Sequence, residues 1–144
     1  MSEKSSILLS AYKALDWDLY IDLSEKITKV SKNSIDENLE FQASLYSHYA
    51  GLEALARLDV DKAESKVEVC ISNVISSTDE KLTVKRMDAI IHADSLVIEA
   101  KEALNQAHYR YNLLHALVKA LEQKKDCLIQ MSSNHRAEIN LYAK

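Results

Sequence analysis

Few residues in this chain stand at spacings that would support catalysis. His108 and His115 are seven residues apart and share a face of an expected helix, but no nearby ligand pair completes a zinc site. Neither Cys70 nor Cys127 has a C-x-x-C partner. A phosphate-cradling loop needs several glycines, and Gly51 is the only one. We therefore predict a protein that is not an enzyme and that holds no metal and no cofactor.

Basic side chains remain as the candidates for chemistry. Single-stranded nucleic acid binds to cationic tracks with aromatic rings, because phosphates pair with the cations and bases stack on the rings. The alternative is that lysines and arginines line a solvated helix face while tyrosines fill the core. The candidate nucleic-acid-binding residues are Arg57, Lys62, Lys66, Lys81, Lys85 and Arg86.

The composition predicts the kind of element that positions these residues. The chain has 144 residues, no proline and one glycine, so turns that need a positive φ or a fixed φ are scarce. That argues against sandwiches, barrels and glycine-loop nucleotide folds. With 47% hydrophobic residues the chain can bury a core. No apolar run reaches the length of a membrane span, and two cysteines are typical of a reducing compartment. We expect a soluble, cytoplasmic, all-α protein without membrane association.

The net charge of −4 hides an asymmetry between the two parts of the chain. Residues 1–80 contain eight Lys or Arg and fifteen Asp or Glu, whereas residues 81–144 contain ten and seven. A protein with this balance does not coat nucleic acid by net charge alone. Any polyanion site must therefore be a local basic patch, concentrated by assembly.

Hydrophobic periodicity and capping residues divide the chain, taken as one domain over 1–144, into five segments. Ser77 is the expected cap of the connecting helix, with Thr83 as the alternative. Alternating β-branched residues leave a minor strand near 66–75 open beside the favoured helix. The segments are short N-terminal helices over 1–33, a long helix over 34–76, a connecting helix over 77–93, a C-terminal assembly helix over 94–134 and a tail over 135–144.

The C-terminal helix carries an apolar seam at three- and four-residue intervals, as in a coiled coil. A stripe this long exceeds what a small monomer is expected to cover, so the pattern predicts a homo-oligomer built as a helical bundle or ring. The expected oligomerisation residues are Leu104, Tyr111, Leu114, Val118, Leu121 and Leu128.

Three stretches of the chain, in this order, resemble segments of one known family. The first, Ala54-Leu55-Ala56-Arg57-Leu58-Asp59, is similar to a helical stretch that ends in Ala-Arg-Leu-Asp in the UvsY family of phage recombination mediators. Lys81-Leu82-Thr83, followed by Ile91-His92-Ala93-Asp94-Ser95-Leu96-Val97, is similar to its Thr…Ala-Asp-x-x-Val segment. The run from Leu104 to Glu138 resembles its long closing helix.

The resemblance implies an oligomeric protein of DNA recombination and repair that binds single-stranded DNA. It would help load a RecA-type recombinase onto strands coated by single-strand-binding protein, in the host cytoplasm if a bacteriophage encodes it. Arg57 matches a basic position of the family, whereas the family's lysine two residues earlier is Leu55 here. The alternative function is a helical protein–protein interaction module, such as a phage scaffold, assembly chaperone or adaptor, without nucleic-acid binding.

Overall fold

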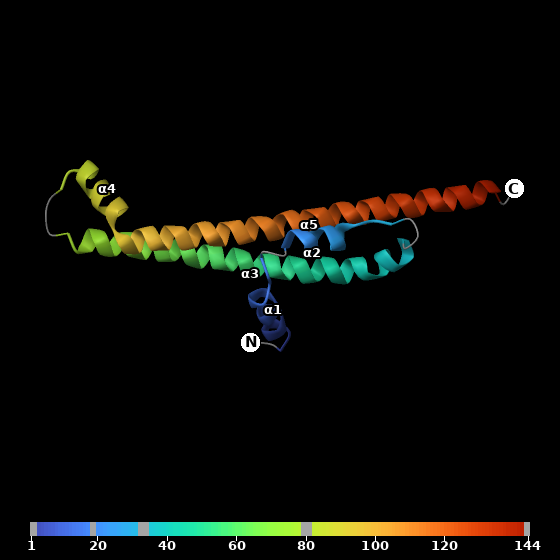
Figure 1. The fold of residues 1–144 in the computed structure, drawn as a ribbon, viewed down its shortest axis with the longest axis horizontal. Helices are drawn as coiled ribbons and strands as arrows, with labels where there is room; N and C mark the ends of the chain where they lie inside the picture. The colour runs from blue at the N-terminus through green and yellow to red at the C-terminus, as the bar shows by residue number, and fades with distance from the viewer. Residues whose placement is uncertain (1–2, 18–19, 32–34, 79–81, 143–144) are drawn as a thin grey trace. The chain divides into compact units, whose positions relative to one another are not determined.

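The computed structural model describes residues 3–17, 20–31, 35–78 and 82–142. These residues form helices and contain no strand, so the all-α prediction is confirmed. The stretch 66–75 lies inside a helix, and the alternative of a strand there is wrong. None of the described helices combines the length and apolarity needed to cross a membrane. The helices are α1 (Glu3–Lys13), α2 (Tyr20–Thr28), α3 (Ile35–Ser76), α4 (Val84–Ala93) and α5 (Ser95–Tyr142) (Figure 1).

Helix α5 runs well past its expected end. The sequence predicts a tail from residue 135, but the described chain is helical to Tyr142. Ser132, Ser133 and Asn134 are weak helix formers, yet no glycine or proline follows to stop the helix. Side-chain bonds one turn apart also support it, because the Gln130 amide donates to Asn134 Oδ1 at 3.1 Å.

Hydroxyl groups replace glycine at the end of α3. The last four carbonyls of a helix have no partner within the helix and are often satisfied beyond a glycine in the left-handed conformation. Here the Ser77 and Thr78 hydroxyls both donate to the Val74 carbonyl, at 3.0 and 2.7 Å. A chain with one glycine therefore ends its long helix with side-chain donors.

Asp94 separates α4 from α5. Its backbone is extended (φ −70°, ψ 126°), and its N–H donates to the Ile90 carbonyl at the end of α4. Its carboxylate accepts the N–H groups of Leu96 and Val97 at 2.9 and 3.0 Å, which caps the start of α5. One aspartate thus ends one helix and begins the next. Thr83, the alternative cap of the sequence analysis, precedes α4, although its side chain makes no capping bond.

The described chain divides into two compact units, and both long helices contribute to each. Unit 1 consists of Met1–Glu53 with Leu113–Lys144, and unit 2 of Ala54–Asn112. In unit 1, α3 and α5 run antiparallel, because Gln42 bonds to Leu121 and, further along α3, Glu53 bonds to His115. In unit 2 the two long helices also lie side by side, because His108 Nε2 of α5 lies 3.9 Å from Glu64 Oε1 of α3.

The seam of α5 is covered by the chain itself. The expectation that a small monomer cannot cover a stripe this long is therefore wrong. In unit 1, Leu114, Leu121 and Leu128 are 0% exposed and Val118 is 4% exposed. In unit 2, Leu104 and Tyr111 are half-buried. The periodicity was sound, but a long antiparallel helix of the same chain supplies the cover that the sequence analysis assigned to partner chains. Oligomerisation through these six residues is therefore not required by burial.

The glycine of the chain lies inside α3, where α1 packs against it. A Cβ atom at Gly51 would lie 2.8 Å from Leu8 Cδ2. The missing side chain therefore lets α1 approach the long helix closely. Trp17 connects α1 with α2, since its ring lies edge-on to that of Tyr12 at a centroid distance of 6.1 Å and stacks on that of Tyr20 at 6.3 Å.

Candidate nucleic-acid interface

Unit 2 contains all six candidate nucleic-acid-binding positions. They come from α3 and from the region of α4, which are separated in sequence by the break after Ser76. Lys81 lies outside the described residues. The other five side chains, Arg57, Lys62, Lys66, Lys85 and Arg86, are exposed.

The three candidates on α3 do not share a face. Successive helical residues are rotated by about 100°, so Lys62 and Lys66 lie about 140° and 180° around the helix from Arg57. Arg57 therefore flanks the buried face of α3 on one side, and the two lysines flank it on the other. The structure does not bring the three into one patch. Lys62 also forms an ion pair with Asp59 at 3.6 Å, which offsets part of its charge.

Helix α4 presents Lys85 and Arg86 in its first turn, and none of its residues is buried. A third cation lies close to it that the sequence analysis did not single out. Lys101 of α5 donates to His92 Nδ1 of α4 at 3.4 Å. The two residues are nine apart across the Asp94 cap, so helical spacing alone gave no signal for this pair.

The stretches that carry the family resemblance have mainly structural roles. Ala56 and Val97 are 0% exposed in the core of unit 2. Asp94 caps α5 through its carboxylate. Arg57, in contrast, is exposed, and no hydrogen bond or ion pair of it is found among the described residues. Of the matched positions, Arg57 is therefore a residue that packing does not explain.

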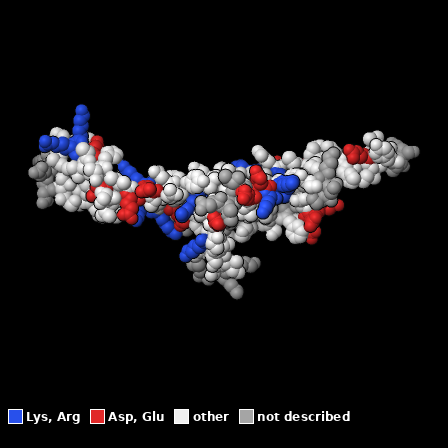
Figure 2. Space-filling view, viewed as in Figure 1, with Lys and Arg blue, Asp and Glu red and all other residues white. Residues whose placement is uncertain are grey.

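Acidic residues accompany the basic ones throughout unit 2. Its described residues include seven Lys or Arg and eight Asp or Glu. On the face drawn in Figure 2, blue and red side chains are interleaved along the helices. A polyanion would therefore meet separate cations with carboxylates between them, and electrostatic binding would depend on repetition of the site.

An exposed aromatic ring accompanies these cations in unit 2. Tyr109 is 57% exposed and directly precedes Arg110 on α5. An exposed tyrosine offers a face on which a base can stack, and a neighbouring cation can pair with a phosphate. Tyr111, two residues on, is half-buried and belongs to the core side of α5.

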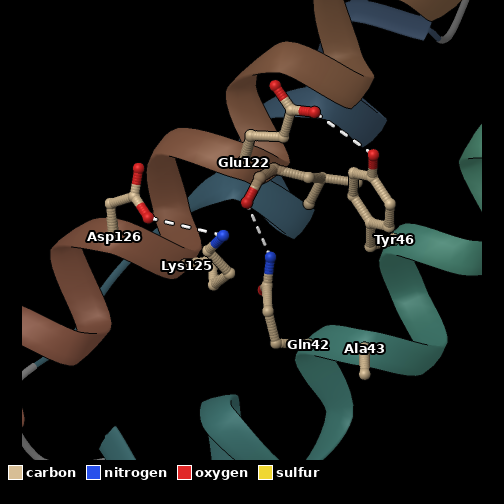
Figure 3. Close-up of a pocket in the computed structure, with 7 residues that line it drawn as sticks. Gln42, Ala43, Tyr46, Glu122, Lys125 and Asp126 are labelled. Atoms are coloured by element: carbon tan, nitrogen blue, oxygen red, sulfur yellow. Dashed lines mark hydrogen bonds and ion pairs between the residues drawn. The ribbon is translucent and has the colours of Figure 1, made fainter.

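Unit 1 contains a surface hollow of about 520 Å³ between α3 and α5. Tyr46 donates to Glu122 at 3.2 Å across it, and Lys125 pairs with Asp126 at 3.6 Å (Figure 3). Lys119 bonds to Glu122 at 2.9 Å, and this bond, with that from Tyr46, lowers the pKa of the carboxyl. Tyr46 and Lys119 thus both bond to Glu122 at this hollow.

Two buried polar side chains interrupt the apolar seam of unit 1. Gln42 is 5% exposed, and its Nε2 donates to the Leu121 carbonyl at 2.7 Å (Figure 3). Its Oε1 is buried and has no hydrogen-bond partner among the described residues. Lys124 is 7% exposed and donates to the Ile27 carbonyl at 2.8 Å, and burial lowers its pKa. Both groups fix the position of one helix against another, a structural role.

Tyr20 attaches the start of α2 to α5. Its hydroxyl donates to the Leu113 carbonyl, and its side chain is 5% exposed. Burial, and to a smaller extent the nearby Tyr49 hydroxyl, raises the pKa of Tyr20 to about 12. A backbone hydrogen bond with Leu117 lowers the pKa and offsets part of this rise. The phenol is thus held in its neutral, hydrogen-bonding form.

Within the described part of the chain, no three His, Cys, Asp or Glu side chains are grouped so that they could hold a metal ion. A comparison with protein-family models finds no match, and no curated protein or solved structure is significantly similar to this chain.

Proposed function

We propose that the protein is an oligomeric single-stranded-DNA-binding recombination mediator that helps load a RecA-type recombinase onto strands coated by single-strand-binding protein. One observation carries this proposal. The Ala54–Asp59 stretch and the 91–97 stretch, which carry much of the family resemblance, fall in the same compact unit as the six candidate basic residues. Packing accounts for the buried members of these stretches and leaves the exposed Arg57 for a ligand.

The chemistry of binding would be modest at each subunit. Arg57, Lys62, Lys66, Lys85 and Arg86 offer exposed cations for phosphates, and Tyr109 offers a ring for a base. Because carboxylates lie among these cations, one subunit should bind weakly. Repetition of the site around a homo-oligomer would raise the overall affinity through multivalency.

The test is fluorescence anisotropy of a labelled single-stranded oligonucleotide, titrated at several salt concentrations between about 50 and 300 mM. A contact with a phosphate of a single strand contributes about 0.7 to the slope of log K against log salt. The variant Arg57→Ala, Lys62→Ala, Lys66→Ala should therefore have a slope smaller in magnitude by about 0.7 for each of the three side chains that contacts a phosphate.

The matched control removes three exposed lysines from unit 1, through Lys13→Ala, Lys26→Ala and Lys29→Ala. It changes the net charge equally, so it should leave the slope close to that of the unmodified protein if binding is local to unit 2. Equal slopes for both triple variants would contradict the assignment of the site. Absence of binding at the lowest salt would contradict DNA binding as a whole.

The mediator role needs a second readout. We expect the protein to shorten the lag before a RecA-type recombinase becomes active as an ATPase on DNA coated with single-strand-binding protein. On bare DNA the effect should be small, because no coating has to be displaced. An equal lag with and without the protein on coated DNA would contradict the loading function even if DNA is bound.

The second candidate function, a helical protein–protein interaction module, is favoured by apolar side chains on the outward faces of the long helices. In unit 2, Leu58 and Val69 of α3 are 47% and 58% exposed, and Ile98 of α5 is 51% exposed. Such residues are typical of surfaces that bind another helix. Affinity capture from nuclease-treated host lysate distinguishes the two: a stoichiometric structural protein supports this function, and a recombinase supports the first.

A further inference from the structure

The apolar seam of α5 continues beyond the region that α3 covers. His135, Ile139 and Tyr142 lie within about 40° of Leu128 around the helix, so they extend the same face. Leu128 is 0% exposed, whereas Ile139 is 53% and Tyr142 is 91% exposed. The face therefore keeps its apolar character after its cover is lost.

The cover ends because α3 begins at Ile35. In unit 1 the hydrogen bonds from Gln42 to Leu121 and from Tyr46 to Glu122 set the antiparallel register of α3 and α5. Continued to its first residue, this register places Ile35 opposite about residue 130 of α5. The last three turns of α5 thus lie past the start of α3 in unit 1.

We propose that these last turns of α5 bind the same segment of a second copy of this chain, in an antiparallel pair. The second copy would extend the existing packing on this face of α5, since the seam already binds an antiparallel helix, α3, over its preceding turns. A parallel second copy is disfavoured because its own α3 would compete for the space that the first α3 fills. An antiparallel copy meets this segment with the same last turns of its own α5, which continue the line of α3. This proposal does not depend on nucleic-acid binding.

The side chains of the segment are complementary to themselves in this arrangement. A two-fold axis between residues 136 and 137 places His135 of one copy opposite Glu138 of the other. It also places Tyr142 opposite Met131, which is half-buried at the edge of the covered seam. The same face has a hollow of about 430 Å³, lined by His135, Glu138, Ile139 and Tyr142, that can accept side chains of the second copy.

The size of the contact sets its expected strength. About twelve residues from each copy would meet. This contact is too small to bury the roughly 1,200 Å² of total surface that is typical of stable interfaces. We therefore expect a weak pair that forms at high micromolar concentration and dissociates on dilution.

The first test is sedimentation velocity of the full chain between about 5 and 500 μM, without DNA. The variant Ile139→Asp, Tyr142→Asp should remain monomeric or lose one association step, because it places charges in the contact. The matched control is Leu141→Asp. Leu141 is 76% exposed but lies about 140° around the helix from the seam, so its variant should associate like the unmodified protein. Association equal in all three proteins, or equally weakened by both variants, would overturn the proposal.

The second test measures the direction of the pair. Cys127 is exposed and can carry a spin label, once the half-buried Cys70 is replaced through Cys70→Ser. In the antiparallel pair the two Cys127 sites are separated by about 19 helical residues along the axis, or about 30 Å. A parallel pair would bring them to about 10 Å. A distance near 30 Å at high concentration supports the proposal, and strong short-range broadening overturns it.

Discussion

Replacing Tyr20 by phenylalanine should destabilise the protein at neutral pH and stabilise it at strongly alkaline pH. The substitution removes the hydrogen bond from the Tyr20 hydroxyl to the Leu113 carbonyl. That carbonyl lies inside α5 and keeps its place in the helical ladder, so the loss is that of one bond, about 1 kcal/mol. Between pH 7 and 9 the unmodified protein should therefore be the more stable by about that amount.

The alkaline part follows from the raised pKa of Tyr20, about 12 in the folded protein against 10.0 for the unperturbed group. Between these values the unfolded chain loses the proton and the folded chain retains it. The unfolded state then binds fewer protons, so the free energy of unfolding falls as the pH rises. Tyr20 contributes a fall of about 1.4 kcal/mol for each pH unit, and this contribution is absent in Tyr20→Phe. The two stability curves should cross near pH 11.

Urea denaturation followed by far-UV circular dichroism, at half-unit steps from pH 7 to 11.5, measures both curves. Tyr142→Phe is the control, because the Tyr142 side chain is 91% exposed and its loss should leave the curve unchanged. Parallel curves for Tyr20→Phe and the unmodified protein would refute the burial of Tyr20 against α5. A difference at neutral pH that exceeds about 3 kcal/mol would indicate that packing, not the hydrogen bond, dominates the contact.

Three further substitutions test contacts within the units. Gln42→Leu should change the free energy of unfolding by less than about 1 kcal/mol, because the loss of the hydrogen bond to the Leu121 carbonyl offsets the removal of a buried amide oxygen without a partner, and urea denaturation measures it. Asp94→Ala should lower it by about 1 kcal/mol through loss of the α5 cap, whereas Asp94→Asn should largely retain it. Gly51→Ala should stabilise the Leu8→Ala variant by about 1 kcal/mol but not the unmodified protein, since the new methyl group there meets Leu8. A thermal-melt double-mutant cycle that finds additive effects would contradict the Leu8 contact.

The limits of α3 followed from the sequence because local chemistry determines them. Acidic residues in the first turn and a run of hydroxyl residues after Ile75 mark its two ends without reference to the rest of the chain. The end of α5 could not be predicted in the same way. Ser132–Asn134 are weak helix formers, and whether the helix continues through them depends on side-chain bonds such as that of Gln130 to Asn134.

The partner of the α5 seam could not be read from periodicity. A stripe of Leu114, Leu121 and Leu128 shows that something covers the helix, but an antiparallel helix of the same chain and a helix of another chain satisfy the same pattern. Closeness in sequence also did not show which candidate cations share a face of a helix. Arg57 and Lys66 are close in sequence, yet nine residues of helical rotation place them on opposite sides of α3.

The absence of buried residues from α4 has a consequence for hydrogen exchange. When α4 opens, it exposes no fully buried apolar side chain, so its opening costs little beyond the hydrogen bonds of its own ten residues. The amide protons of α4 should exchange through local opening of this helix. Those of Leu114 and Leu121 should exchange much more slowly, because their exchange requires the long helices to separate. The segment with two of the candidate cations, Lys85 and Arg86, is thus free to change its conformation without unfolding the rest of the protein.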